Sequence, residues 1–493
     1  MSLDLGFRYE YNGAPFNAPG LPYPGTDFSN IACFPSAGVT CNTRQQADGS
    51  QWGPRAGVTY SPEFLGSRKT VFRAGFGVFY DVVYTNISDN TQASAPNAAS
   101  PQINSSSSAN GNRGTANWFE NFASLNPNPL PTNTAEPITN HLLSPRTIHW
   151  NLGFERELPW ATALRVNYVG ERGEHLYGNE NLNPFVNEDL IGPDRVIPTR
   201  GAIIARDNSG DSNYTGLWAE VDHRFSHSFL FRGSYTLGKS MDDVSEIFTT
   251  NNQSSYPSSR FPNNRGTSDY GPSGYDHRQR LVLSYIWTPP LWHTEGVMKV
   301  AGNIVNHWSF AGITQFQAGT PENVEVGYDT NGDGIFNDRP ALANPKAPLT
   351  TYAFDDSWFY GVSQGTLCSG PSYWYTNNPC EVVQPTDVHW IVTPFGQEVK
   401  NAVGRNSLYT PGFQQWDITI QRSFKIWENV QFDFRGDLFN AFNHGEANVV
   451  STTLTTGIPT DQFTGPNGTN TFANYPLGIT GHRNAQFFGR IRF

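Results

Sequence analysis

Ala485-Gln-Phe-Phe-Gly-Arg-Ile-Arg-Phe493 closes the sequence, and apart from Phe488 its side chains alternate between an apolar and a polar face. One face carries Phe487, Ile491 and Phe493, whereas the other carries Arg490 and Arg492. Alternation with a period of two predicts a β-strand with one apolar side. A bacterial outer-membrane barrel commonly ends in such a strand with a terminal Phe, and a soluble β-sandwich seldom does. We therefore expect Phe487, Ile491 and Phe493 to form the signal that the barrel-assembly machinery reads.

The composition describes a β-rich chain with long irregular connections. The 493 residues include 47 Gly and 35 Pro, 14% are aromatic and 15% are charged. The mean hydropathy is −0.48, and no run of about 18 apolar residues occurs, which excludes membrane-spanning helices. A transmembrane β-barrel remains, because its strands are apolar on one side only. The net charge of −11, without a basic cluster, argues against a nucleic-acid partner.

Alternation along the whole chain predicts about twelve strands, each long enough to cross a bilayer when tilted. They run near residues 3–11, 54–61, 70–81, 147–157, 162–170, 215–226, 228–239, 279–288, 307–318, 414–424, 429–441 and 485–493. Tight turns alternate with connections far longer than is usual in compact domains. This layout is typical of an outer-membrane barrel. A half-exposed sandwich would explain the alternation but not the regular order of long and short connections.

The two faces of the predicted strands differ in kind. In strand 429–441, Phe432 and Phe434 alternate with Asp433, Arg435 and Asp437. In strands 162–170 and 228–239, a single cation, Arg165 and Arg232 respectively, stands on the face opposite the apolar residues. Charges at every second position belong on the wet, inner side of a barrel. The residues expected to face the lumen are Arg165, Arg232, Asp433, Arg435 and Asp437.

The four cysteines fall into two local pairs in loops rich in Gly, Pro and Ser. Cys33 lies near Cys41, and Cys368 lies near Cys380. Two short-range disulfides in an oxidising compartment are the favoured interpretation. Four unrelated thiols are the alternative.

One loop resembles the first half of a calcium-binding loop. Side-chain oxygens at Asp329, Asn331 and Asp333 precede Gly334 at the sharp turn. Pro340 stands where a closing bidentate carboxylate is expected, so Asn337 or Asp338 would have to replace it. The alternative is a plain turn in which Asn-Gly and Asp-Gly adopt positive φ. No cofactor is required, and calcium in the 329–340 loop is the one candidate.

The sequence offers little for catalysis. Neither H-E-x-x-H nor G-x-S-x-G occurs, and the eleven histidines are scattered. A hydrolase would need a Ser/His pair that folding brings together. The chain is therefore predicted not to be an enzyme.

Several strings resemble a known family when they are taken in order. They are Gly53-Pro-Arg-Ala-Gly-Val-Thr-Tyr60 with Thr70-Val-Phe-Arg-Ala-Gly-Phe-Gly-Val-Phe-Tyr-Asp81, Asn151-Leu-Gly-Phe-Glu-Arg-Glu-Leu-Pro159, Asp276-His-Arg-Gln-Arg-Leu-Val-Leu-Ser-Tyr285, the loop ending at Pro340, Gly404-Arg-Asn-Ser-Leu-Tyr-Thr-Pro-Gly-Phe-Gln-Gln-Trp-Asp417, and Phe439-Asn-Ala-Phe-Asn-His444. Together they resemble the C-terminal part of the barrel in the Oar-like family of TonB-dependent outer-membrane receptors. The resemblance covers most of the chain.

This resemblance implies a barrel of about 22 strands filled by a plug domain, with further domains ahead of it. We expect residues 1–493 to form one receptor-like β-barrel domain, roughly the C-terminal half of that barrel, with the plug, the N-terminal domains and the signal peptide missing. Contact with TonB would then run only through the missing N-terminal part. The wall charges would hydrogen-bond within the wall or pack against the plug more readily than contact a ligand.

The resemblance also implies the location, the partners and the function. We expect uptake of an unidentified small, peptide or glycan ligand across the bacterial outer membrane, with membrane lipid and the barrel-assembly machinery as partners. The alternative is a self-sufficient pore or adhesion barrel of about twelve strands, since smaller even counts occur.

Overall fold

The computed structural model describes most of the chain outside its longest connections. It describes residues 1–13, 47–66, 69–83, 142–181, 203–226, 228–247, 270–291, 305–326, 338–349, 351–355, 373–375, 378–382, 385–392, 402–427, 430–447 and 479–493, and isolated residues between these ranges. No helix within these ranges is long and apolar enough to cross a membrane.

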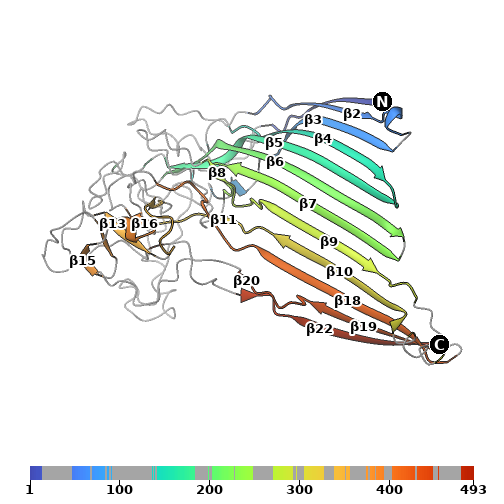
Figure 1. Cartoon of the computed structure of the whole chain (residues 1–493). Coiled ribbons are helices and arrows are strands. Elements are labelled where there is room, and N and C mark those ends of the chain that lie inside the picture. The colour runs from blue at the N-terminus through green and yellow to red at the C-terminus, as the bar shows by residue number, and fades with distance from the viewer. Residues whose placement is uncertain are drawn as a thin grey trace, which may run out of the picture.

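Among the described residues, twelve strands follow one another across a single sheet, in the order in which they occur along the chain (Figure 1). They are β1 (Ser2–Tyr9), β2 (Trp52–Tyr60), β3 (Thr70–Tyr80), β4 (Arg146–Leu158), β5 (Thr162–Asn181), β6 (Ile204–Ser226), β7 (Phe229–Asp242), β9 (Gln279–Trp287), β10 (Trp308–Gln317), β18 (Phe413–Lys425), β19 (Gln431–Phe439) and β22 (Asn484–Arg492). Every neighbouring pair is antiparallel. The predicted twelve-strand antiparallel sheet is therefore confirmed.

Two strands extend well beyond their predicted ends. The predicted segments 162–170 and 215–226 continue to Asn181 in β5 and back to Ile204 in β6. The ladder between these extensions shifts register twice, near Leu176. Alternation weakens there because strand ends that pass beyond the bilayer no longer need an apolar side.

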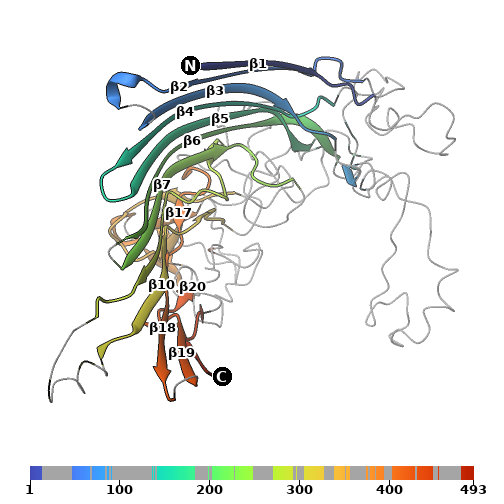
Figure 2. The same ribbon diagram turned by 90° about the vertical axis from the view of Figure 1, so that its right-hand side faces the viewer.

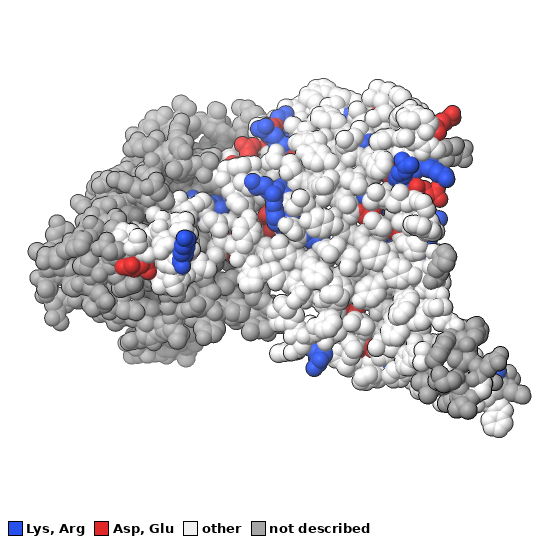
Figure 3. Space-filling view, viewed as in Figure 1, with Lys and Arg blue, Asp and Glu red and all other residues white. Residues whose placement is uncertain are grey.

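The sheet bends along its whole width (Figure 2). Among the described strands, β1 and β22 lie at its two edges. The space-filling view shows few charged side chains over the middle of the sheet, and the charged ones gather toward its two ends (Figure 3). Apolar rings pair across strands on that side, with centroids 5.4 Å apart for Phe72 and Phe154, and 6.3 Å apart for Phe434 and Phe487. Such a surface suits contact with lipid rather than with water.

Tryptophans lie at both ends of the strands. Trp160, Trp287, Trp308 and Trp427 are at the short-turn end, and Trp416 is near the long-connection end, where it packs edge-on against Phe442. Trp287 lies 5.6 Å from Phe310 between ring centroids. These positions match the two aromatic girdles that membrane β-barrels place at the membrane interfaces.

The long connections carry small sheets and cores of their own. Between β10 and β18, a five-stranded sheet has the order β12 (Ala341–Leu342), β16 (Trp390–Val392), β13 (Tyr352–Asp355), β14 (Tyr373–Tyr375) and β15 (Asn378–Val382). Shorter pairings join β8 (Gly271–Pro272) to β7, β11 (Pro321–Glu322) to β17 (Leu408–Tyr409), and β20 (Glu446–Ala447) to β21 (Ile479–Thr480). Two 3-10 turns span Glu63–Leu65 and Pro385–Asp387.

The buried apolar side chains lie mainly in the long connections and at the strand ends next to them. One cluster contains Ile87, Ile138, Leu142, Tyr177 and Ile247. Many large apolar side chains of the strands, in contrast, are exposed. This distribution is inverted relative to a water-soluble domain, because the strands meet lipid and only the loops must build a core against water.

Candidate functional site on the inner wall of the sheet

A network of ion pairs crosses five strands on the polar side of the sheet. Arg73 of β3 lies 2.8 Å from Glu155 of β4, which also lies 3.2 Å from Arg165 of β5. The Arg165 Nη1 group donates to Glu220 of β6 over 2.6 Å. Pairing directly opposite one another, Asp222 of β6 and Arg232 of β7 extend the network at 2.9 Å. The predicted lumen residues Arg165 and Arg232 therefore share one face and one network.

The energetic weight of this network is modest for each pair. Arg232 remains 58% exposed in its side chain, and exposed pairs contribute about 0 to 1 kcal/mol each. The larger consequence is positional, since cross-strand partners fix where each guanidinium lies. The network makes a wall on which fixed charges alternate in sign.

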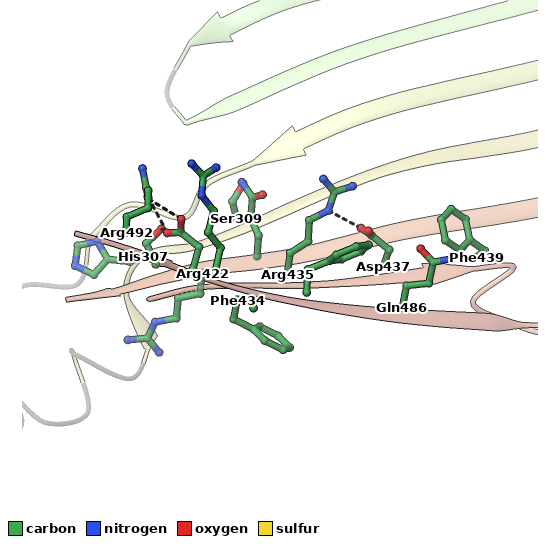
Figure 4. A pocket seen from close by; sticks show the side chains of 15 residues that line it. His307, Ser309, Arg422, Phe434, Arg435, Asp437, Phe439, Gln486 and Arg492 are labelled. Atoms are coloured by element: carbon green, nitrogen blue, oxygen red, sulfur yellow. Dashed lines mark hydrogen bonds and ion pairs between the residues drawn. The ribbon is translucent and has the colours of Figure 1, made fainter. Parts of the chain in front are cut away.

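A groove of about 800 Å³ lies farther along the same wall, between β10, β18, β19 and β22. Arg435 and Asp437 are on one side of the ribbon and Phe434 is on the other, so β19 separates a polar side from an apolar one (Figure 4). On its polar side the groove is lined by Arg435, Arg490 and Arg492 against Asp433 and Asp437, whereas Arg422, opposite Phe434, lies on the apolar side. Its lining therefore contains more arginines than aspartates.

Both aspartates of the groove are held by several donors. Arg492 grips Asp433 with two nitrogens, at 2.7 Å each, and Ser423 donates to the same carboxylate over 2.6 Å. Asp437 accepts from Arg435 over 2.9 Å and from Thr419 over 2.7 Å. The predicted residues Asp433, Arg435 and Asp437 thus lie together on the groove.

Phe488 is an aromatic side chain within this polar wall. It is 51% exposed, and the Arg435 guanidinium lies 5.9 Å from the centre of its ring. An arginine over a ring and an exposed ring face together can contact a ligand that is both anionic and flat. Sequence alternation places Phe488 on this face but does not supply its partner.

A buried ion pair at the long-connection end was not predicted. The side chain of Arg405 is fully buried and pairs with Asp242 at the end of β7. Arg405 also donates to the Asp242 carbonyl over 2.8 Å and to Ser245 Oγ over 3.2 Å. Burial lowers the pKa of Arg405 to about 10, which leaves it charged at neutral pH. The pair ties the chain before β18 to the rim of β7.

Two further contacts strengthen this junction. The Asn406 side-chain amide donates to the Pro272 carbonyl over 2.7 Å, and the Asn406 backbone N–H donates to Asn323 over 3.3 Å. A side chain at Gly271 would stand 2.7 Å from the Arg405 carbonyl oxygen, so only glycine fits this approach. The string that begins Gly404-Arg405-Asn406 was the one sequence signal for this junction.

Glu325 is a second unpredicted group near this junction. Burial raises its pKa to about 7, against the opposing effects of a hydrogen bond with Asn323 and the charge of Arg339. Its backbone carbonyl accepts from Leu454 over 2.9 Å, which links two long connections. The carboxyl group therefore titrates near neutral pH at a place where loops meet.

The calcium prediction falls mostly outside the described residues. Asp329, Asn331, Asp333 and Asn337 lie there, whereas Asp338 is described and its carbonyl accepts from Val326 over 2.8 Å. Among the residues that the structure describes, no three His, Cys, Asp or Glu side chains are arranged to hold a metal ion. Calcium binding stays a prediction.

The disulfide prediction also falls mostly outside the described residues. Cys33, Cys41 and Cys368 lie outside the described residues. Cys380 lies in β15, where the backbone alone is described. Both pairings stay predictions.

The predicted assembly signal lies at the end of the last strand. Phe487 and Ile491 of β22 stand opposite Gly436 and Phe432, on the apolar side, and Phe493 follows the strand with 94% of its surface exposed. Its role in assembly stays a prediction.

Comparison with known proteins gives one family match. A family model described as an outer membrane beta barrel domain matches residues 1–486. No curated protein sequence matches the chain.

Several solved structures are similar in fold at low identity. The outer membrane transporter YddB from Escherichia coli is 10% identical, with a TM-score of 0.42 over 90% of this chain and 40% of that one. The siderophore receptor PirA from Pseudomonas aeruginosa is 8% identical, with a TM-score of 0.33 over 91% of this chain and 42% of that one. The ferric enterobactin receptor PfeA from the same organism is 9% identical, with a TM-score of 0.38 over 91% of this chain and 40% of that one. The chain spans less than half the length of these proteins.

Proposed function

This chain belongs to the outer membrane beta barrel domain family and lies in the bacterial outer membrane. We therefore propose that it forms part of the barrel wall of a TonB-dependent receptor that takes up an unidentified ligand. The proposal extends to the Oar-like subfamily, whose strings the sequence resembles. The intact receptor would include a plug domain and a segment that contacts TonB. Transport, rather than covalent chemistry, is its primary role.

The observation that carries this proposal is the paired-charge wall on one side of a lipid-compatible sheet. A structural barrel needs an apolar outer side, but it does not need a network such as that from Arg73 to Arg232. Fixed, mutually paired charges keep a passage hydrated without holding any one ion tightly. The arginine excess at the groove favours ligands with anionic groups.

The proposed mechanism has three stages. The long connections capture the ligand, and the Arg405–Asp242 junction holds part of that loop layer against the rim of the sheet. Rearrangement of the plug then opens a path, and the ligand moves along the polar wall. Phe488 and Arg435 offer a contact on this path for a flat, anionic group.

The order of the sheet favours a large barrel over a self-sufficient pore of about twelve strands. A closed barrel of that size needs a ladder between the first and last strands, whereas within the described part of the chain β1 and β22 lie at opposite edges of the sheet. In a larger barrel, both edges pair with other strands of the wall.

The proposal is tested by ligand accumulation in cells. The native gene product would be expressed in isogenic strains with and without TonB, and a panel of radiolabelled anionic, peptide and glycan compounds would be screened. We expect at least one compound to accumulate only when both the protein and TonB are present. Accumulation that needs the protein but is equal in both strains would support the passive pore and overturn the receptor proposal.

A further inference from the structure

A β-bulge near the short turn between β6 and β7 places two reactive side chains on the same face. His223 pairs with Phe231, and the next pair is Ser226 with Phe229, so Arg224 and Phe225 together stand opposite Leu230. In a regular strand, residues three apart point to opposite sides. The extra residue of the bulge reverses this, so Ser226 joins His223 on the side of Phe229 and Phe231.

Three side chains there form a directed chain of hydrogen bonds. Ser226 Oγ lies 2.9 Å from His223 Nε2, and His223 Nδ1 lies 2.8 Å from Oγ1 of Thr162, the opposing residue on β5. The Thr162 hydroxyl donates its one proton to the Trp160 carbonyl over 3.1 Å. With that proton on the Trp160 carbonyl, Thr162 Oγ1 accepts from His223 Nδ1, and this assigns the imidazole proton to Nδ1. Nε2 is then left as the acceptor for the Ser226 hydroxyl.

This arrangement matches that of an activated serine nucleophile. The nucleophile stands within hydrogen-bond reach of a base, and a third group orients that base in the required tautomer. The three residues are 61 and 3 positions apart in sequence. No local motif could reveal them, because strand pairing and the bulge bring them together.

The surroundings indicate which substrate could reach the serine. The three residues are partly exposed on the apolar side of the sheet, at its short-turn end. Nearby Trp160 is 78% exposed and Phe225 is 58% exposed, and the ring of Phe229 lies 6.1 Å from that of His223. Exposed aromatic side chains of this kind mark the membrane interface. The boundary between acyl chains and headgroups, where the ester carbonyls of glycerolipids are found, lies at the same level.

We propose that Ser226 is a nucleophile for carboxylic esters of membrane glycerolipids, with His223 as its general base and Thr162 as the residue that positions His223. Ser226 Oγ bonds to the ester carbonyl carbon while its proton passes to His223 Nε2. The bond from that carbon to the glycerol oxygen breaks, and the glycerol oxygen takes the proton from Nε2. Water then attacks the acyl-serine through the same base, which releases the fatty acid and restores the hydroxyl. This activity is separate from transport along the inner wall.

The test is covalent labelling with an alkyl fluorophosphonate, which phosphonylates activated serines with loss of fluoride. The full-length protein, purified in detergent from outer membranes, would be incubated with the probe and analysed by peptide mass spectrometry. We expect labelling on Ser226, lost in Ser226→Ala, and slowed by about 100-fold or more in His223→Gln, the usual scale for loss of a general base. Release of fatty acid from phospholipid micelles should fall in parallel.

Ser228→Ala, in the same turn, is the matched control and should label as the wild type does. Circular dichroism and resistance of the folded band to unfolding in detergent would show that each variant retains the sheet. Thr162→Val should lower the maximal labelling rate constant without changing the probe concentration for half-maximal rate, and Thr162→Ser should restore it. A folded wild-type protein that labels no faster than Ser226→Ala would overturn the proposal, and so would equal labelling in His223→Gln.

Discussion

Removing the carboxylate of Asp242 should loosen the loop layer far more than removing any charge from the inner wall. The Arg405 side chain is fully buried, and that of Asp242 is 8% exposed. In Asp242→Ala, the guanidinium loses its counter-charge and keeps the Asp242 backbone carbonyl, at 2.8 Å, and Ser245 as partners. Breaking a buried ion pair from one side costs about 3 to 5 kcal/mol, because the buried guanidinium loses its nearest carboxylate.

Hydrogen exchange measures this cost where it occurs. Amides of residues 402–410 and 271–276 should exchange faster in Asp242→Ala by about two to nearly four orders of magnitude, at about 1.4 kcal/mol per tenfold change. Amides in the middle of β18 should be unaffected, because they lie in the sheet.

Two controls separate burial from charge. Arg73→Ala removes a partly exposed pair from the inner wall and should cost no more than about 1 kcal/mol. The double variant Arg405→Met with Asp242→Leu removes both charges and should recover most of the loss. Exchange in Asp242→Ala that matches Arg73→Ala would refute the assignment of this pair as the junction.

Three further predictions concern other parts of the molecule. Phe434→Arg should lower the free energy of unfolding by roughly 2 to 4 kcal/mol near the bilayer midplane, whereas Asp433→Asn should lower it only slightly. Unfolding in lipid vesicles measures both changes. Equal losses of stability would contradict the assignment of faces on β19. Glu325 has a folded pKa of about 7, above its ordinary value of 4.5, so its loop contacts should be most stable at low pH and lose stability as the pH rises from about 4.5 through 7. Exchange of the Val326 and Leu454 amides reports this, Glu325→Gln should abolish the dependence, and an unchanged dependence in that variant would rule out Glu325 as its source. Titration calorimetry should detect calcium binding that Asp329→Ala removes, and no heat at millimolar calcium would exclude the metal.

The sequence could predict the strands because lipid and water impose opposite demands on alternate residues. Strand β19 illustrates this, since Phe432 and Phe434 must meet lipid while Asp433 and Arg435 must meet water. The extensions of β5 and β6 escaped prediction because beyond the bilayer both sides are wet and the alternation fades.

The candidate site was predictable in its face but not in its partners. Alternation placed Arg165 and Arg232 on the inner side. The pairing of Arg165 with Glu155 and Glu220 depends on strand register, which follows from folding. Register is specified by the whole sheet rather than by any one segment.

Contacts between distant segments could not be predicted from the sequence for the same reason. Arg405 and Asp242 are 163 residues apart, and neither stands in an alternating pattern. Ser226 and His223 are close in sequence, but an ideal strand would separate them, and only the bulge reverses that expectation.

The most direct test of the account is a cysteine scan along β19 in outer membranes, with each residue from 431 to 439 replaced in turn in a background lacking the four native cysteines. A charged, membrane-impermeant thiol reagent and a lipid-soluble quencher would measure water and lipid access. We predict water access at Gln431, Asp433, Arg435 and Asp437, and lipid access at Phe432, Phe434 and Leu438. Uniform access along the strand, or the reverse pattern, would contradict the claim that this sheet is a barrel wall with a charged inner face.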